Sequence, residues 1–171
     1  MPIYALGDRV PQIHPDAFIH PDAVVIGDVR IGADSSIWPC AVLRGDYGTI
    51  IVGERTSIQD GAVIHAVDEY PTVIGSDCVI GHLAHLEGCV VHDRVLVGSG
   101  SIVLHEAEVQ SGATVGAGAV VRNRTNVPTR ATALGVPATL RLDSCNEDVA
   151  VASAALYANN ARRYKAELKI L

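Results

Sequence analysis

The side chains best suited to chemistry in this 171-residue chain lie between positions 44 and 89. They are guanidinium, carboxylate, amide and imidazole groups, carried by Arg44, Asp46, Gln59, Asp60, His65, His82, His85 and Glu87. Imidazoles and carboxylates are ligands of zinc and related divalent metals, and a zinc site in a protein needs at least three of them to converge. The sequence therefore indicates a metal site, provided that the fold brings three of these groups together.

An aliphatic residue recurs at every sixth position, with breaks after Leu43 and Ile64 and a slip of one residue before Val91, and this period indicates how these side chains are arranged. The eighteen positions are Ile13, Ile19, Val25, Ile31, Ile37, Leu43, Val52, Ile58, Ile64, Ile74, Ile80, Leu86, Val91, Val97, Val103, Val109, Val115 and Val121. An amphipathic helix needs apolar residues at spacings of three and four, and a β-meander needs alternation. A period of six is typical instead of a parallel β-helix, in which three repeats make one triangular coil. We therefore predict an all-β solenoid of about six coils.

The remaining segments are predicted from the same pattern. A small or β-branched residue stands four positions after most of the aliphatic ones and marks an inward-facing corner, which makes Cys78 a core residue. The breaks at 46–48 and 67–70 are predicted to be short loops that bulge from one face. Residues 122–142 lack a clear period and are predicted to cross the solenoid end in extended form. Ser144 and Glu147 form a capping box, which predicts a C-terminal helix. The domains are thus 1–142, the solenoid, and 143–171, a helix packed on it.

Stacking of the repeats predicts which side chains meet. Residues three repeats apart lie on one face, about 4.8 Å apart. Arg44, His65 and Glu87 follow Leu43, Ile64 and Leu86, so they form one outward column, between Ile26 and Leu104. Asp60 and His82 stack on the adjoining face, with Gln59 beside Asp60. The remaining histidines are interpreted as exposed polar residues: His14, His20, His92 and His105.

A single convex prism cannot bring its two faces onto one ion, whereas a neighbouring subunit can. If the column of one chain meets the Asp60 and His82 corner of another, then His65, Glu87 and the second chain's His82 converge. A closed ring of such heterologous contacts is naturally a trimer. The sequence therefore predicts a homotrimer with metal sites between its subunits.

The composition argues against nucleic acid and membranes as partners. The net charge of −6 does not favour binding to nucleic acid or to an anionic membrane. No apolar run approaches the length of a membrane-spanning helix, and the first ten residues lack the features of a signal peptide. The four cysteines form no C-x-x-C pair and are interpreted as free thiols. We expect a cytoplasmic protein.

Several motifs resemble the γ-class carbonic anhydrase family over nearly the whole chain. They are IWPCAVLRGD at 37–46, TSIQD at 56–60, IGH at 80–82, LEGC at 86–89 and GVPA at 135–138. The resemblance implies a left-handed β-helix trimer that binds zinc or iron through three histidines at each subunit interface and hydrates carbon dioxide to bicarbonate. The first two histidines match His65 and His82. The third position is Glu87 in this chain.

The substitution at Glu87 bears on the activity that the resemblance implies. Glutamate can still be a ligand, because sets of two histidines and one glutamate bind zinc. An anionic ligand reduces the acidity of metal-bound water, whose pKa must approach about 7 for hydration. We therefore expect weak carbon dioxide hydration. His85, two residues away on the same strand and face, is the alternative third ligand.

The resemblance also suggests roles for other residues. Arg44, Asp46 and Asp60 match interfacial family residues, as part of catalysis or of an ion network that stabilises the trimer. Gln59 matches a residue that hydrogen-bonds to metal-bound hydroxide or bicarbonate. Proton transfer would rely on His85, Glu69 or water. Ser57 replaces the usual asparagine, and Tyr157 is interpreted as a packing residue.

Two other functions use the same fold. The trimer could bind a small anion or a metal chelate without catalysis, with Arg44 near the metal favouring an anionic ligand. It could also be a hexapeptide acyltransferase, with a catalytic histidine and an acyl-CoA cleft between subunits. The Arg44-Gly45-Asp46 and Gln59-Asp60 motifs argue against the acyltransferase.

Overall fold

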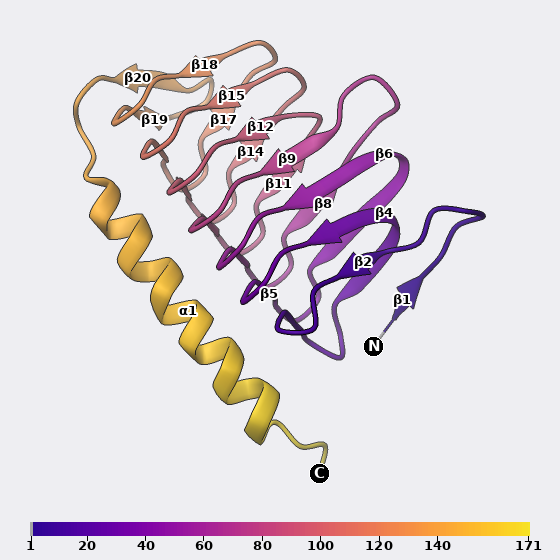
Figure 1. Ribbon diagram of the computed structural model, residues 1–171. Helices are drawn as coiled ribbons and strands as arrows, with labels where there is room; N and C mark the ends of the chain where they lie inside the picture. Colours follow the sequence, from indigo (N-terminus) through magenta and orange to yellow (C-terminus); the bar gives the residue numbers. More distant parts are fainter. Residues whose placement is uncertain (1) are drawn as a thin grey trace.

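Short strands stacked coil upon coil form a left-handed parallel β-helix of about seven turns, with one long helix along its side (Figure 1). This computed structural model describes residues 2–171. The strands form two sheets, which make up the three faces of the solenoid. Among the described residues, all paired strands are parallel except the last pair, β19 and β20, which is antiparallel. The predicted fold is therefore confirmed.

The first face, here called the helix face, is an eight-stranded sheet that α1 covers. Its strands are β3 (Phe18–Ile19), β5 (Ser36–Ile37), β7 (Ser57–Ile58), β10 (Val79–Ile80), β13 (Leu96–Val97), β16 (Thr114–Val115), β19 (Thr132–Leu134) and β20 (Thr139–Arg141).

The other two faces belong to a twelve-stranded sheet, because β4 (Val24–Ile31) and β6 (Val42–Val52) turn a corner without ending. The column face contains the first halves of these strands. It continues in β8 (Val63–His65), β11 (His85–Glu87), β14 (Ile102–Val103) and β17 (Val120–Val121), and β1 (Ile3–Tyr4) pairs with β4. The third face contains their second halves with β2 (Gln12–Ile13), β9 (Thr72–Ile74), β12 (Val90–Val91), β15 (Glu108–Val109) and β18 (Asn126–Val127).

The core follows the six-residue period. Every predicted aliphatic position is buried except Ile13, which is partly buried and packs against the core. The predicted corner residues, Cys78 among them, are buried as well. Each aliphatic side chain buried in this way contributes about 1.5–3 kcal/mol. Because a slip of one residue would turn the whole series outward, the core fixes the register of every coil.

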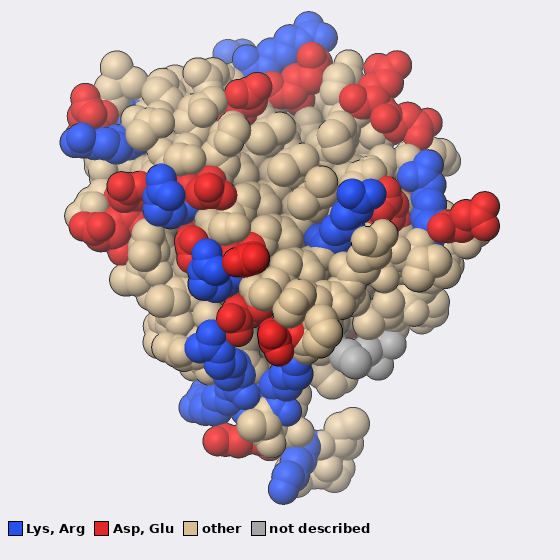
Figure 2. Space-filling view, viewed as in Figure 1, with Lys and Arg blue, Asp and Glu red and all other residues tan. Residues whose placement is uncertain are grey.

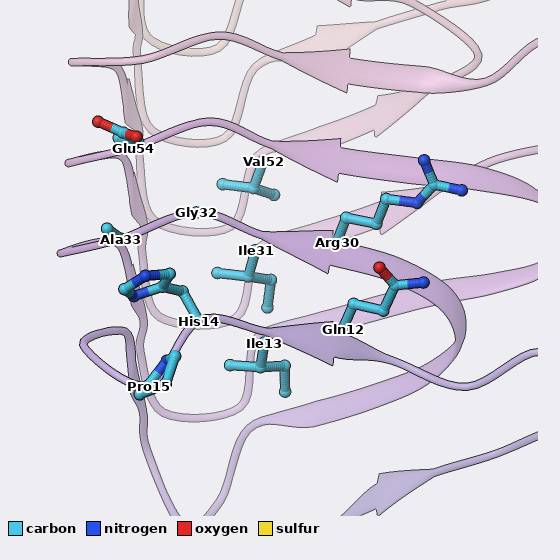
Figure 3. A pocket seen from close by; sticks show the side chains of 10 residues that line it. All are labelled: Gln12, Ile13, His14, Pro15, Arg30, Ile31, Gly32, Ala33, Val52 and Glu54. Atoms are coloured by element: carbon cyan, nitrogen blue, oxygen red, sulfur yellow. The ribbon is translucent and has the colours of Figure 1, made fainter.

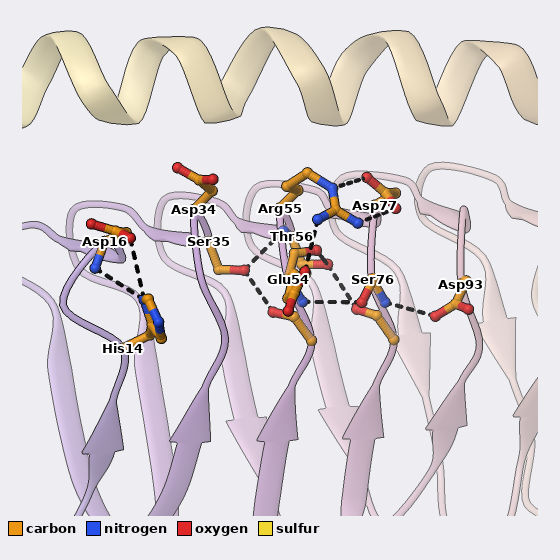
Figure 4. Close-up of polar contacts among 12 residues, drawn as sticks. His14, Asp16, Asp34, Ser35, Glu54, Arg55, Thr56, Ser76, Asp77 and Asp93 are labelled. Carbon is orange, nitrogen blue, oxygen red and sulfur yellow. Dashed lines mark hydrogen bonds and ion pairs between the residues drawn. The ribbon is translucent and has the colours of Figure 1, made fainter.

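A ladder of side-chain hydrogen bonds joins successive coils at the corner beside α1 (Figure 4). The Ser35 hydroxyl donates to the Gly53 carbonyl at 2.6 Å and accepts from the Thr56 amide at 2.9 Å. The Thr56 hydroxyl repeats this one coil later, towards the Gly75 carbonyl and the Cys78 amide. Small hydroxyl residues suit these inward corner positions for two reasons: the space is limited, and their side chains form the hydrogen bonds that buried backbone groups need.

Two predictions about the chain between the strands are wrong. Residues 46–48 lie inside β6 rather than in a bulging loop. The period also continues after Val121, because Val127 and Ala133 are buried in β18 and β19. The segment 122–142 therefore adds another coil before β20 closes the end. A small alanine in place of a branched aliphatic residue obscured this last repeat.

The helix α1 (Glu147–Glu167) starts later than the capping box predicts. Asn146 is the N-cap, and its side chain accepts a hydrogen bond from the Asp148 amide at 3.0 Å. The Ser144 hydroxyl donates instead to the Arg141 carbonyl at 2.7 Å. The Glu147 carboxylate accepts from Arg94 of the solenoid at 2.9 Å, which ties the first turn to β-strand connections below it.

The inner side of α1 packs on the helix face through small and aromatic residues. Its buried residues are Ala150, Ala154, Ala158 and Ala161. Trp38 lies between Tyr157 and Tyr164, with ring centroids 6.1 and 5.1 Å away. Tyr157 is therefore a packing residue, as predicted. Within residues 2–171, no helix is both long and apolar enough to cross a membrane.

The buried thiols generate a testable prediction. Burial raises the pKa of Cys78 and of Cys89 from 9.0 to about 12. The folded state thus keeps both thiols protonated, and the stability this contributes is complete below pH 9 and is lost as the pH rises towards 12. At pH 8, we expect iodoacetamide to label the exposed Cys40 and to spare Cys78 and Cys89 until the protein unfolds.

Peptide mapping by mass spectrometry after timed labelling measures this. A Cys40→Ser variant is the control, and it should lose the fast labelling while its alkaline unfolding matches that of the wild type. Fast labelling of Cys78 in the folded protein would contradict the burial of this corner.

Candidate metal and anion site

The predicted column is present on the column face. Arg44 is in register with His65 in the next strand, and His65 is in register with Glu87 in the strand after it. The residue before each of them points inward and is fully buried, namely Leu43, Ile64 and Leu86. The column is therefore held by core packing, because each outward side chain follows an anchored inward one.

Hydrogen bonds connect the column along its length. Arg44 Nη1 donates to Asp46 Oδ2. His65 Nε2 lies 3.0 Å from Asp46 Oδ1, and His65 Nδ1 lies 2.8 Å from Glu87 Oε1. Both ring nitrogens of His65 thus face carboxylate oxygens. The predicted residues Arg44, Asp46, His65 and Glu87 form one continuous chain of contacts.

These contacts determine the ionisation of the two carboxylates. Partial burial acts to raise the pKa of Asp46, but hydrogen bonds from His65 and Arg44 outweigh it and lower that pKa. Burial likewise acts to raise the pKa of Glu87, and hydrogen bonds from His65 and His85 with the charge of nearby histidines lower it. Both side chains are therefore anionic ligands or acceptors at neutral pH.

Glu87 is surrounded by imidazoles. His85 Nε2 lies 3.2 Å from Glu87 Oε2, and His105 Nε2 lies 3.6 Å from Glu87 Oε1. His105 also stacks on Tyr70, at the end of the break at 67–70, with ring centroids 5.9 Å apart. The prediction that His105 is merely an exposed polar residue is wrong. The stacking register could have predicted this position of His105, because the residue before it, Leu104, stacks on Glu87.

Thr72, the first residue of β9, supports the column from behind. The Thr72 hydroxyl donates to the His65 carbonyl. The Gly88 amide donates to the same hydroxyl at 2.8 Å. One buried threonine therefore fixes the ends of two neighbouring strands, immediately beside the two side chains that contact each other.

The corner pair, Asp60 and His82, stacks as predicted between the helix face and the column face. His82 Nδ1 lies 3.0 Å from Asp60 Oδ2, and each side chain is 50% exposed. Gln59, beside Asp60, is only 4% exposed. Its Nε2 has no hydrogen-bond partner within residues 2–171, so this buried amide is a free donor. Ser57, in contrast, is occupied, because its hydroxyl accepts from Trp38 Nε1 at 2.9 Å.

The donor set that the sequence predicts for a divalent metal is not gathered at one place within the described chain. Two imidazoles and one carboxylate, from His65, His82 and Glu87, are a known ligand set for zinc. In one chain, the column projects from the column face, whereas the corner pair projects from the corner between that face and the helix face. Within the described part of the chain, no three histidine, cysteine, aspartate or glutamate side chains are grouped to hold a metal.

Cavities and charge do not identify a competing site. A shallow cavity of about 540 Å³ on the third face has Gln12, His14, Arg30 and Glu54 in its lining (Figure 3). None of its lining residues belongs to the column or the corner pair. Figure 2 shows acidic and basic side chains interspersed on the side seen in Figure 1. Many of them are paired, for example Arg55 with Asp77 at 2.7 Å.

Comparison with known proteins agrees with the hexapeptide-repeat fold. The family described as Bacterial transferase hexapeptide (six repeats) matches residues 11–45. Gamma carbonic anhydrase 1, mitochondrial, of Arabidopsis thaliana is 40% identical over 168 residues, which cover 94% of this chain and 61% of that protein. The chain thus spans less than two thirds of that relative.

This chain covers a larger share of two further proteins. The carnitine operon protein CaiE of Escherichia coli K12 is 40% identical over 138 residues, which cover 81% of this chain and 70% of that protein. A solved hexapeptide transferase family protein of Anaplasma phagocytophilum is 36% identical, with a TM-score of 0.91, over 95% of this chain and 98% of that one. The chain belongs to the hexapeptide-repeat family of left-handed β-helix proteins, in its γ-carbonic anhydrase-like branch.

Proposed function

We propose that this chain forms a cytoplasmic homotrimer that binds a divalent metal between subunits and weakly catalyses the reversible hydration of carbon dioxide to bicarbonate. The observation that carries the proposal is the column of Arg44, His65 and Glu87 on one face, with His82 at a separate corner. One chain cannot make both converge, whereas the corner of a neighbouring chain can reach the column. The relatives named gamma carbonic anhydrase support the same assignment.

The surroundings of the column support burial against another subunit. Besides the polar residues, its outward side chains are aliphatic: Val24, Ile26, Val42, Val63, Ile102, Leu104 and Val120. An uncovered sheet face normally alternates between apolar inward and polar outward residues. Outward aliphatic side chains that continue over several strands are instead typical of the apolar centre of a subunit interface. The helix face has its own cover in α1, whereas the column face has none within residues 2–171.

We propose His65, His82 and Glu87 as the metal ligands, with zinc as the metal and iron as the alternative. A bound divalent metal supplies a Lewis acid that lowers the pKa of water and so provides hydroxide near neutral pH. His65 would have to exchange one of its two carboxylate contacts to offer a nitrogen. Glu87 would bring negative charge, which reduces that acidity and makes the activity weak.

The other residues of the site position these groups and the substrate. Asp46 orients the His65 ring through Nε2, and Arg44 holds Asp46 in place. This arrangement resembles the carboxylate–histidine pairs that orient metal ligands in other proteins. The Gln59 amide is the free donor that could hold an oxygen of bicarbonate. Asp60 fixes the ring of His82 in the same way as Asp46 fixes that of His65.

His85 remains the alternative third ligand, since its Nε2 lies beside Glu87 on the column face. It could also pass a proton from the site to solvent, as could the exposed Glu69 in the break at 67–70. Both roles place His85 at the edge of the same interface. Substitutions of His85 and of Glu87 show which of the two residues binds the metal.

A second candidate is a trimer that binds a small anion without catalysis. The observation in its favour is that Glu87 is already hydrogen-bonded to His65 and His85, as expected of a stable polar network. Against it, the Arg44 guanidinium is paired with Asp46 and so offers less positive charge to an anion. An acyltransferase is the weakest candidate, because the column and corner motifs are not explained by it.

Assembly is the first test of the proposal. At micromolar concentration, sedimentation equilibrium should give three times the chain mass of 18.0 kDa, with metal bound in proportion to subunits. The physical reason is that the three donors converge only between chains. A stable monomer that retains stoichiometric metal would contradict the shared site.

Substitution of Glu87 tests the chemistry. Glu87→His replaces an anionic ligand with a neutral one, so it should retain metal and raise carbon dioxide hydration about tenfold or more from a low baseline. The fold should persist, since an outward position contributes little to core packing. Stopped-flow hydration assays with elemental analysis measure both quantities. A high wild-type rate with Glu87 bound to metal would show that its charge matters little.

The third ligand is identified by a matched pair of variants. If Glu87 is the ligand, Glu87→Ala should release the metal and His85→Ala should retain it, and the opposite result assigns His85. If metal survives both substitutions but is lost with His65→Ala, neither residue is the third ligand.

A further inference from the structure

The corner beside His82 contains a vertical series of turn residues with positive φ. On five successive coils these are Cys40, Gly61, Leu83, Gly100 and Gly118, with φ between 60° and 67°. We call this series the turn column. Each coil joins the one before it by a backbone hydrogen bond, such as the Leu83 amide to the Asp60 carbonyl at 3.0 Å and the Gly100 amide to the His82 carbonyl at 2.8 Å. The fold therefore imposes the same left-handed conformation at every level.

Leu83 is exceptional in this series. Its φ is +60°, a conformation that glycine adopts freely and that a branched side chain disfavours. The other non-glycine residues with positive φ within residues 2–171 are Asp34, Cys40, Arg55, Asp77, Arg94, Glu106, Arg124, Arg130 and Asp143. All of these except Cys40 are charged, and many form ion pairs. Leu83 is thus the one aliphatic residue in such a turn, and it is 71% exposed.

Nothing inside the described chain compensates for this leucine. Its side chain lies over Gly61 of the preceding coil, where an added Cβ would come within 2.7 Å of Leu83 Cδ2. It covers a glycine rather than filling the core. Its place is nevertheless specific, because it directly follows His82 and its amide bonds to Asp60, the partner of His82.

The corner and the column face have complementary chemistry. The corner presents an apolar side chain, Leu83, next to a half-exposed carboxylate, Asp60. The column face presents outward aliphatic residues, of which Val63 is 38% exposed, next to the guanidinium of Arg44, whose side chain is 43% exposed. Arg44 and Asp60 are each already paired within the chain, with Asp46 and His82, so the match between the two surfaces is chiefly apolar: an exposed leucine on one and an aliphatic frame on the other. In the proposed ring of identical chains, these two surfaces would meet.

We propose that Leu83 is the apolar anchor that docks each chain on the column face of the next copy, and that it thereby positions His82 beside the neighbour's His65 and Glu87. The inference rests on the proposed trimer and adds the residue that holds its interface in register. Leu83 is a positioning residue, because it touches neither metal nor substrate. The strain of its turn is tolerated because the side chain is buried on assembly.

The test separates the fold of one chain from its assembly. Leu83→Gly suits the positive φ, so the thermal midpoint at low protein concentration should stay the same or rise. The same variant should raise the concentration at which half of the trimer dissociates by about tenfold or more, since an interface anchor is lost. Leu83→Met keeps an apolar side chain and should restore assembly to near the wild-type level. Sedimentation velocity over a dilution series measures all three proteins.

Arg130→Gly is the matched control. Arg130 has a φ of +59° and lies beside the start of α1, where its carbonyl accepts from the Ser144 amide, so its replacement relieves the same kind of backbone strain away from the proposed interface. Its dissociation should equal that of the wild type. A wild-type trimer that Leu83→Gly leaves equally stable would overturn the role of Leu83 and leave the trimer standing. A monomeric wild-type chain would overturn both.

Discussion

The inward packing of Leu43, Ile64 and Leu86 sets the arrangement on which the rest of the molecule depends. These side chains are fully buried and stack on three successive coils. Because side chains alternate along a strand, the residue after each must point outward, so Arg44, His65 and Glu87 are placed one strand spacing apart. Polar residues that are distant in sequence are thus brought together by the hydrophobic core, and their contacts with one another follow from that placement.

Once adjacent, these residues neutralise one another. His65 contacts a carboxylate at each ring nitrogen, and Glu87 contacts His65 and His85. The column is therefore a stable polar network in a single chain and a potential set of ligands in an assembly. Glu87 stands where the family resemblance implies a histidine, so it adds a carboxylate to this network and, in the proposed assembly, would lower the acidity of a bound metal. The same residue thus accounts for the weak hydration that we propose.

The six-residue period was sufficient to predict the solenoid, the buried positions, the column and the separate corner. It could not show that β6 continues through Asp46, because a continuous strand that turns a corner and an inserted loop interrupt the period in the same way. As a result, the contact between Asp46 and His65 was not foreseen. The pattern identifies inward positions only, so it gave no sign that Leu83 occupies a left-handed turn. Asn146 was missed as the N-cap because Ser144 and Glu147 have the spacing of a capping box.

Subunit complementation tests most directly whether the site is shared between chains. His65→Ala chains keep His82, and His82→Ala chains keep the column, so each variant alone should bind almost no metal. After the two are dissociated, mixed equally and reassembled, about one quarter of the interfaces should pair an intact column with an intact corner. Elemental analysis should then recover about a quarter of the wild-type metal. A mixture that binds no more metal than its separate components would contradict a site built from two chains.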